Sequence, residues 1–275
     1  MFEVCDQFVS EFEKVIESPR KEKSSVYYTG VDLGTACVVM AVLNEKKEPG
    51  AGAFQYADVV RDGMVVDYAG AIRIVSEMKK KIEKELDTEL LYAAAALPPG
   101  TDSLDGGAVK NVVQAAGFEV TALLDEPTAA NALLSLENGA IVDIGGGTTG
   151  VSVIKDGKVI LVDDMPTGGT HFSLVLAGAY RIPYAEADVM KRDYSRHKEY
   201  FPLVRPVIAK LAAIINKTIE GQDVPQLVLV GGTSCLTGIE KEIEQLTKIP
   251  TYKPQNPLFV TPLGIALNCV AEEDI

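Results

Sequence analysis

The sequence lacks several features that mark common classes of protein. Its 275 residues include no basic run, and the formal net charge of −13 argues against general nucleic-acid binding and against an anionic membrane surface. The cysteines are far apart and form no CxxC pair, so neither a disulfide framework nor a zinc site is indicated. We therefore expect buried thiols in a reducing cytosol at all four positions, which are Cys5, Cys37, Cys235 and Cys269.

Long apolar segments are absent as well. Residues 1–25 are charged throughout and contain no apolar core of a signal peptide, and no run of about 18 apolar residues could span a membrane. These absences predict a cytoplasmic protein without a membrane span. The two histidines, His171 and His197, are isolated from acidic partners in the sequence, and we expect them to be structural or exposed.

The sequence does contain alternating short apolar strands and helices, and its length allows one or two domains. The first element is an amphipathic helix over residues 2–18, which a charged linker, "RKEKSS", separates from the first strand. Two interpretations of this helix stay open: its apolar stripe packs on the first domain, or it docks into a groove of a partner.

Further elements are predicted along the chain. We expect helices over 68–87 and 202–220, and a hairpin at Asp156-Gly157. The charged segment 79–89 is expected to be a solvated helix face, and the small residues Ala93–Ala96 to pack in the core.

One sequence frame occurs twice. "YTGVDLGT" (28–35) and "AIVDIGGGTT" (140–149) both read apolar, Asp, apolar, Gly and then Thr, and each opens a half with strands first and helices after. Two copies are too few for a solenoid, so we predict two similar α/β domains with a cleft between them. The predicted boundaries are 1–25 for the N-terminal helix and linker, 26–138 plus 258–275 for domain I, and 139–257 for domain II.

The glycine loops suit a phosphate group. A phosphate-binding loop needs inward-pointing backbone N–H groups and no Cβ in the way, which Gly145, Gly146 and Gly147 provide. Thr148 and Thr149 add hydroxyl donors, and Asp143 at the strand end is placed to hold a divalent cation through water.

The first copy of the frame, residues 28–35, offers the same kinds of residue: Asp32, Gly34 and Thr35. Two such loops clamping a polyphosphate and one metal ion would suit phosphoryl transfer. A tight hairpin alone could explain one loop, although two in frame make that reading weak. The motif is not a Walker loop, since GKS and GKT are absent, and not a Rossmann fingerprint, since Asp precedes the glycines.

The motifs resemble the actin-like ATPase superfamily, which includes actin, DnaK-type chaperones, sugar kinases, MreB, FtsA and PilM. The likeness covers about residues 26–270, and "VRDGMVVD" (60–67) is most similar to the MreB, FtsA and PilM side. The motifs that carry it, in order, are "GVDLGT" (30–35), "DEPTAAN" (125–131), "DIGGGTT" (143–149), "GGTHF" (168–172), "LVGGTS" (229–234) and "TPLGIAL" (261–267).

This resemblance implies a two-domain actin/DnaK-like fold with duplicated ribonuclease-H-like domains and reduced peripheral subdomains. It implies ATP or ADP and Mg²⁺ as ligands, with Asp32 and Asp143 holding the metal through water and Asp143 or Glu126 orienting the attacking water. Thr35, Thr148 and Thr149 would bind phosphate. The residues implied near adenosine are Gly231, Gly232, Thr233, Glu186 and Lys191. Residues 127–131 and 262–267 would form crossing helices about which the domains rotate.

Two departures from the superfamily pattern bear on activity. Only about eight residues separate "PYAEADVMKRD" (183–193) from Pro202, where DnaK and actin insert a subdomain that walls the adenine pocket, so affinity is expected to be weak. The stretch 45–60 offers no match for the catalytic lysine of DnaK, so we expect hydrolysis to be slow or absent.

Within the superfamily, the short length and the chaperone-like motifs are most similar to the EutJ family of ethanolamine-utilisation proteins. That implies a chaperone-like or reactivation factor whose protein partners are pathway enzymes or shell proteins of a microcompartment, where the N-terminal helix would act as an encapsulation tag. A nucleotide-binding scaffold of the PilM or FtsA type is the alternative. A small-molecule kinase is a third reading, disfavoured because kinases of this fold carry larger insertions.

Overall fold

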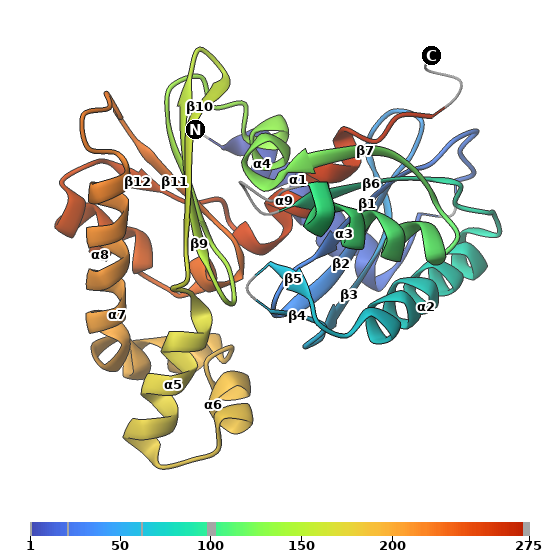
Figure 1. Cartoon of the computed structure of the whole chain (residues 1–275). Helices are drawn as coiled ribbons and strands as arrows, with labels where there is room; N and C mark the ends of the chain where they lie inside the picture. Colours follow the sequence, from blue (N-terminus) through green and yellow to red (C-terminus); the bar gives the residue numbers. More distant parts are fainter. Residues whose placement is uncertain (1, 21, 62, 98–102, 272–275) are drawn as a thin grey trace. The chain divides into compact units, whose positions relative to one another are not determined.

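The computed structural model describes residues 2–20, 22–61, 63–97 and 103–271 (Figure 1). The expected ends of "ELLYAAAALP" at Pro98-Pro99 lie outside the described residues. The chain forms two compact units: unit 1 contains Met1–Ser135 and Pro254–Ile275, and unit 2 contains Leu136–Lys253. Among the described residues, no helix combines the length and apolarity that crossing a membrane requires.

Unit 1 is built on a five-stranded mixed sheet. In sheet order its strands are β3 (Pro49–Tyr56), β2 (Cys37–Leu43), β1 (Tyr28–Leu33), β6 (Tyr92–Leu97) and β7 (Glu119–Asp125). The first three are antiparallel, and β1, β6 and β7 are parallel. A small hairpin, β4 (Val60–Arg61) with β5 (Met64–Val65), precedes α2 (Tyr68–Leu86). Residues of α2 and α3 (Ser103–Ala115) complete one core with the sheet. Ala93–Ala96 are all buried as expected, and Ala93 and Ala95 belong to this core.

Helices α4 (Glu126–Leu134) and α9 (Val260–Leu267) pack against each other, and α9 packs on β1. The contact depends on small residues. A Cβ at Gly264 would lie 1.8 Å from the Ala129 carbonyl oxygen, and one at Gly30 would lie 2.5 Å from the Ala266 nitrogen. The small residues in "DEPTAAN" and "TPLGIAL" therefore permit close backbone approach between these elements.

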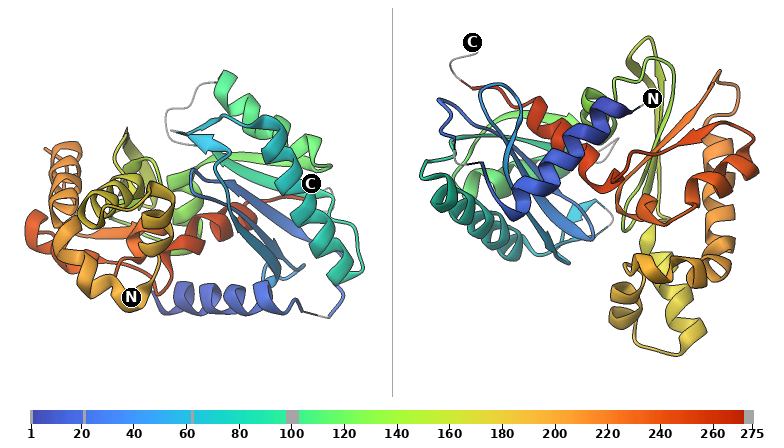
Figure 2. Two further views of the ribbon diagram at one scale, coloured as in Figure 1. Left: turned by 90° about the horizontal axis from the view of Figure 1, so that it is seen from below. Right: turned by 180° about the vertical axis from the view of Figure 1, so that it is seen from behind.

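The N-terminal helix α1 (Glu3–Glu17) lies along β3 (Figure 2). Its apolar stripe is buried, and Phe12, with no exposed surface, makes an edge-to-face contact with Phe259 at a centroid distance of 5.3 Å. Of the two interpretations of this helix, packing on the first domain is the one that the structure supports.

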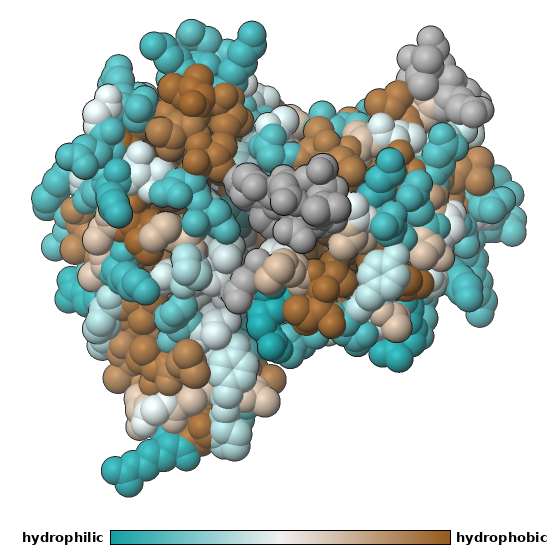
Figure 3. Space-filling model, viewed as in Figure 1, coloured by the Kyte–Doolittle hydropathy of each residue, from teal (hydrophilic) through white to brown (hydrophobic). Residues whose placement is uncertain are grey.

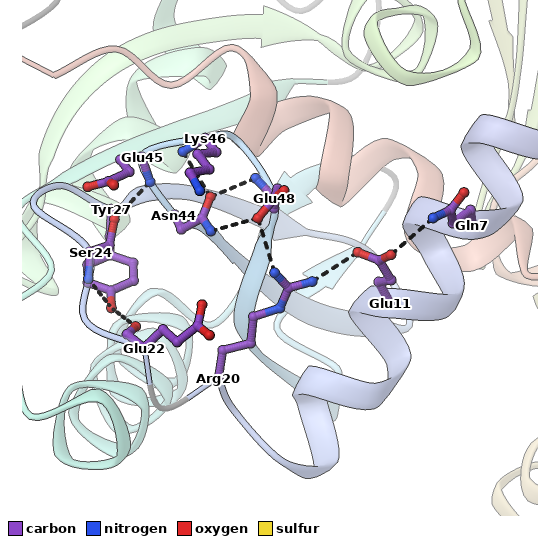
Figure 4. Close-up of polar contacts among 10 residues, drawn as sticks. All are labelled: Gln7, Glu11, Arg20, Glu22, Ser24, Tyr27, Asn44, Glu45, Lys46 and Glu48. Atoms are coloured by element: carbon purple, nitrogen blue, oxygen red, sulfur yellow. Dashed lines mark hydrogen bonds and ion pairs between the residues drawn. The ribbon is translucent and has the colours of Figure 1, made fainter.

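Polar contacts fix the linker after α1 (Figure 4). The Arg20 guanidinium forms ion pairs with Glu11 at 3.0 Å and Glu48 at 3.1 Å, and the Arg20 N–H donates to the Gly50 carbonyl at 2.8 Å. Because these bonds join α1, the linker and β3, the helix is held at its end as well as along its stripe.

Unit 2 repeats the sheet of unit 1. Its strands, in sheet order, are β10 (Lys158–Met165), β9 (Thr149–Lys155), β8 (Gly139–Ile144), β11 (Leu227–Val230) and β12 (Thr251–Tyr252). The expected hairpin at Asp156-Gly157 joins β9 to β10. The helices are α5 (Gly169–Tyr180), α6 (Tyr184–Met190), α7 (His197–Thr218) and α8 (Ile239–Thr247), with 3₁₀ turns η1 (Tyr194–Arg196) and η2 (Gly232–Cys235) in unit 2 and η3 (Pro257–Phe259) in unit 1.

Both hairpins carry a bulge at the same place. In unit 1 the pairing passes from Val42↔Ala51 to Leu43↔Pro49 and skips Gly50. In unit 2 it passes from Val153↔Leu161 to Ile154↔Val159 and skips Ile160. Asp32 and Asp143 also occupy the same register, opposite Val39 and Gly150. The repeated frame in the sequence therefore corresponds to a repeated structure, and the prediction of an α/β fold is confirmed.

Three sequence expectations need correction. Helix α7 begins at His197, one and a half turns before Pro202, because Pro202 and Pro206 both lie on its exposed side. Lys79 is buried rather than solvated, since its Nζ pairs with Glu83 at 3.1 Å and lies over the Phe118 ring. Of the four cysteines, Cys5 and Cys269 are buried but Cys37 and Cys235 are only partly so.

Candidate functional site

In unit 2, the loop Asp143–Thr149 connects β8 to β9. The Gly145 N–H donates to the Thr148 carbonyl at 3.0 Å, which closes a tight turn. Asp143 is the penultimate residue of β8 and is partly exposed, whereas the strand residues around it are buried. The core thus fixes the position of this carboxylate at the strand end.

The carbonyl side of the loop faces the start of α5. The Gly145 carbonyl accepts from the Gly169 N–H at 3.0 Å, and the Gly146 carbonyl accepts from the Thr170 N–H at 2.8 Å. In a trans peptide, C=O and N–H point in opposite directions, and none of the described peptides is cis. The N–H groups of Gly146 and Gly147 therefore point away from α5, as a phosphate-binding loop requires.

The two threonines of the loop differ. Thr148 is partly exposed. Thr149 has no exposed surface, and its hydroxyl donates to the Thr167 carbonyl at 2.6 Å. That hydroxyl anchors β9 to the segment before α5, which leaves Thr148 as the hydroxyl available to a phosphate.

The turn after β11 packs directly on this loop. Gly231 has a φ of 85°, and a Cβ there would lie 2.2 Å from Oδ1 of Asp143 and 2.7 Å from the Ile144 carbonyl oxygen. The Thr233 hydroxyl donates to the Gly145 carbonyl at 2.7 Å. The structure thus brings the predicted adenosine residues Gly231, Gly232 and Thr233 to the predicted phosphate loop.

Lys191, just after α6, belongs to the same cluster. Its Nζ donates to the Gly169 carbonyl at 3.1 Å and pairs with Asp188 at 2.7 Å. Glu186 instead lies on the exposed side of α6. The carboxylate beside Lys191 is therefore Asp188, which sequence reasoning missed although its i,i+3 spacing from Lys191 is a signal for a helical ion pair.

The electrostatics of this pair follow from partial burial. Burial lowers the pKa of the Lys191 ammonium, and the adjacent Asp188 carboxylate opposes that shift. Burial by itself would raise the pKa of Asp188, but Lys191, Ser173 and Arg192 together outweigh it and lower that pKa. Asp188 also contacts the Arg192 guanidinium. The result is a cation held beside the loop by a carboxylate that stays ionised.

Unit 1 supplies the remaining predicted residues. Asp32 is the penultimate residue of β1, and Gly34 and Thr35 form the turn to β2; all three are partly exposed. Glu126 is the first residue of α4, whose N-cap Asp125 accepts from the Thr128 N–H at 2.8 Å. Each lies where a strand of the sheet ends.

One of the two lysines in the segment 45–60 makes contacts at the far end of β1. Lys47, in the turn between β2 and β3, donates to the Cys269 carbonyl at 2.6 Å, and its Nζ lies 3.2 Å from the Tyr28 ring centroid. Tyr28 is the first residue of β1, so this ammonium lies at the opposite end of that strand from Asp32.

Two further features bear on ligands. A cavity of about 450 Å³ in unit 2 is lined by Tyr194, Ser195, His197, Lys198, Phe201, Pro202, Thr237 and Gly238, next to the turn after β11. Within the described part of the chain, no group of three or more His, Cys, Asp and Glu side chains is placed to hold a metal ion.

Family models match two parts of the chain. The model described as "MreB/Mbl protein" matches residues 50–182, and that of "Cell division protein FtsA" matches residues 140–264. Among solved structures, the "PilM-PilN type IV pilus biogenesis complex" aligns with a TM-score of 0.74 at 16% identity, covering 90% of this chain and 98% of that one. "MreB 5 of Spiroplasma citri bound to AMPPNP" aligns with a TM-score of 0.69 at 18% identity, covering 88% and 95%.

At such identities the alignments show the fold alone. Together with the duplicated sheets they define an actin-like two-domain fold, and the matching MreB and FtsA family models agree with it. A more specific relationship comes from a relative that is 45% identical over 240 residues, 87% of this chain and 84% of its own length: "Ethanolamine utilization protein EutJ" of Salmonella typhimurium. The chain belongs to the EutJ family.

A solved structure agrees with that assignment. EutJ from Carboxydothermus hydrogenoformans aligns with a TM-score of 0.91 at 47% identity, covering 96% of this chain and 97% of that one. More distantly, "Chaperone protein HscA homolog" of Burkholderia thailandensis is 25% identical over 258 residues, 75% of this chain and 42% of that protein.

Proposed function

We propose that this chain binds ATP and ADP with Mg²⁺ and acts as a nucleotide-dependent switch in ethanolamine utilisation, as a chaperone-like or reactivation factor for enzymes of that pathway. The observation that carries the proposal is the convergence on one loop in unit 2. Asp143, the outward amides of Gly146 and Gly147, the Gly231–Thr233 turn and Lys191 all meet at this loop.

The donor set fits a nucleotide. Outward loop amides and the Thr148 hydroxyl suit phosphate oxygens. Mg²⁺ keeps several waters and is commonly bound through one or two carboxylates and phosphate oxygens. Asp143 would act in this way in unit 2, and Asp32 occupies the equivalent register position in unit 1.

The biological assignment is supported by the relatives. The EutJ name supports ethanolamine utilisation, and the likeness to an HscA homolog supports a chaperone-like role. We propose a cytoplasmic location, associated with a bacterial microcompartment, with pathway enzymes or shell proteins as partners.

Isothermal titration with ATP, ADP and a non-hydrolysable ATP analogue, each with Mg²⁺, tests the proposal. Micromolar binding with different affinities for ATP and ADP is the expected result for a switch. Asp223→Ala, which removes an exposed carboxylate from a loop of unit 2, should bind like the unmodified chain. Absence of binding by the unmodified chain would contradict the proposal.

A second candidate is a nucleotide-binding scaffold with little or no hydrolysis, of the PilM or FtsA type. The engagement of Lys47 at the end of β1 opposite Asp32 favours it, because this ammonium is held away from the candidate site of unit 1. Phosphate release under saturating ATP separates the two candidates: steady turnover favours the switch, and intact binding without turnover favours the scaffold.

A further inference from the structure

His197 joins two segments of the candidate site in unit 2. It is the first residue of α7, and 3% of it is exposed. Its Nδ1 lies 3.1 Å from both the backbone nitrogen and the hydroxyl oxygen of Thr237, and its Nε2 lies 3.2 Å from the Lys191 carbonyl oxygen. The ring therefore bridges the end of the turn after β11 and the end of α6.

These contacts determine the tautomer. The Thr237 N–H can only donate, so Nδ1 accepts and carries no proton. Nε2 then carries the proton and donates to the Lys191 carbonyl. The Nδ1 bond requires a neutral imidazole, whereas the Nε2 bond can form in either state. The ring makes both bonds away from water, where an unmade bond is costly.

The bridged segments are those that hold the phosphate loop. Thr233, four residues before Thr237, donates its hydroxyl to the Gly145 carbonyl, and Lys191, the other end of the bridge, donates its ammonium to the Gly169 carbonyl. We propose that neutral His197 is a positioning residue of the nucleotide site, which fixes the Gly231–Thr233 turn against Lys191, and that its protonation loosens this arrangement and weakens nucleotide binding. The inference rests on the proposed function.

Protonation has a defined structural effect. A proton on Nδ1 can donate to the Thr237 hydroxyl, but the Thr237 N–H then loses its acceptor. The charged ring would also be buried among other charges. The Tyr194 ring lies 4.9 Å from it, and the charged side chains on the elements around it include Asp188, Lys191, Arg192, Asp193, Arg196, Lys198, Glu199, Lys253 and Glu240, the last paired with Lys253 at 3.1 Å.

The pH range follows from the direction of the shift. Burial lowers the pKa of His197 below its ordinary 6.5, and Lys253 acts in the same direction, while the Lys191 carbonyl and Asp193 oppose them. The ring is therefore neutral at pH 7.5, and the loosening develops as the pH falls below 6.5 toward the lower pKa of the folded protein.

Titration with ADP and Mg²⁺ at pH 7.5 and pH 5.5 tests the proposal on the whole chain. We expect the unmodified chain to lose more affinity on acidification than His197→Gln, whose amide keeps a donor but does not titrate. The difference should stay below about tenfold, because the pKa of His197 lies below 6.5. The nucleotide phosphate also titrates in this range, so the difference between the two proteins is the measured quantity. Equal losses in both would overturn the pH dependence.

A control variant on α7 separates the positioning role of His197 from a general effect on stability. Ile215→Val removes one methyl group from a fully buried side chain, so it should lower the melting temperature and leave ADP affinity unchanged. His197→Ala should weaken ADP binding about tenfold at pH 7.5, through the loss of its bridging hydrogen bonds. An unchanged ADP affinity in His197→Ala would overturn the positioning role.

Hydrogen exchange without nucleotide gives an independent result. The Thr237 amide should exchange faster in His197→Ala than in the unmodified chain or Ile215→Val, and equal protection would overturn the bridge itself. If the unmodified chain bound no nucleotide at pH 7.5, the proposed function would fail, and the proposed effect on the nucleotide site would fail with it. The exchange experiment would still decide whether His197 holds the turn.

Discussion

The two units contain the same sheet, but the edge strand β3 of unit 1 is covered by a helix, whereas residues of the equivalent strand β10 of unit 2 are exposed. In both units the third strand in chain order, β3 or β10, forms one edge of the sheet. Each has a bulge at the equivalent residue, Gly50 in β3 and Ile160 in β10. Along β3 lies α1, and the bulge carbonyl accepts from the Arg20 N–H. Along β10, Ile160 is 51% exposed and Val162 is 38% exposed. Figure 3 shows apolar surface over this hairpin.

The difference explains one glycine. By register, Gly52 of β3 corresponds to Val162 of β10, since they pair with Ala41 and Ser152 at matching positions. A Cβ at Gly52 would lie 2.5 Å from Cε2 of Phe12. Gly52 thus provides space that α1 occupies, whereas β10, with no such helix in the described residues, carries a branched side chain there.

Of the substitutions considered, Phe12→Ala should have the largest effect, because it removes a buried contact between α1 and β3. The side chain has no exposed surface and packs on Gly52 and Phe259, so its loss should lower the free energy of unfolding by about 4 kcal/mol. Urea unfolding measures this. Val4→Ala on the same helix removes a 79% exposed side chain and should change it by less than about 0.5 kcal/mol. Equal small effects would instead favour a detachable docking helix.

Asp143→Ala tests the second difference between the units, the glycine-rich loop of unit 2. If Asp143 holds the metal ion, this variant should lose about 100-fold or more in Mg²⁺-dependent nucleotide affinity, with the fold intact, because the carboxylate lies at a loop. Titration calorimetry measures the affinity, and circular dichroism checks the fold. Asp143→Asn keeps the size of the side chain without its charge. Unchanged ATP affinity in both variants would remove Asp143 from the site.

Gly52→Val makes β3 resemble β10. The new side chain meets Phe12 and Ile16, neither of which can move far in a buried contact, so we expect a loss of about 2 kcal/mol in the free energy of unfolding. The reciprocal variant, Val162→Gly, should cost about 1 kcal/mol or less, because it removes a partly exposed side chain from an edge strand. If Val162→Gly cost more than Gly52→Val, the space argument would be wrong.

Much of the fold was predictable because its signals are local. Strand periodicity, the Asp156-Gly157 turn and the repeated Asp–Gly frame each depend on a few neighbouring residues, and the structure confirms the strands, the hairpin and the duplication. The interpretation of α1 was left open because its stripe shows that one face is buried but not which surface covers it. That surface is β3, whose glycines lie far away in the sequence.

The remaining differences between the sequence predictions and the structure come from contacts between residues that are distant in the sequence or that lie on one face of a helix. Lys79 in a charged segment becomes buried because Glu83 and the Phe118 ring receive its ammonium. Glu186 and Asp188 are equally acidic in the sequence, but only the position three residues before Lys191 faces that lysine. His197 gave no sequence signal at all, since its partners Lys191 and Thr237 meet only in the folded unit.

Ile160→Thr should have the smallest effect and examines the exposed strip itself. Threonine keeps the β-branched shape that suits a strand, and half of the isoleucine surface is already in water, so the free energy of unfolding should change by less than about 0.5 kcal/mol. Urea unfolding measures the change. Ile154→Thr on the neighbouring β9 is the matched control: that side chain is 1% exposed, so the same substitution should cost about 2 kcal/mol through lost apolar contact and a buried hydroxyl. A comparable cost at Ile160 would mean that another surface, outside the contacts described for β10, covers this exposed strip. Both edge strands would then be covered, β3 by α1 and β10 by that other surface.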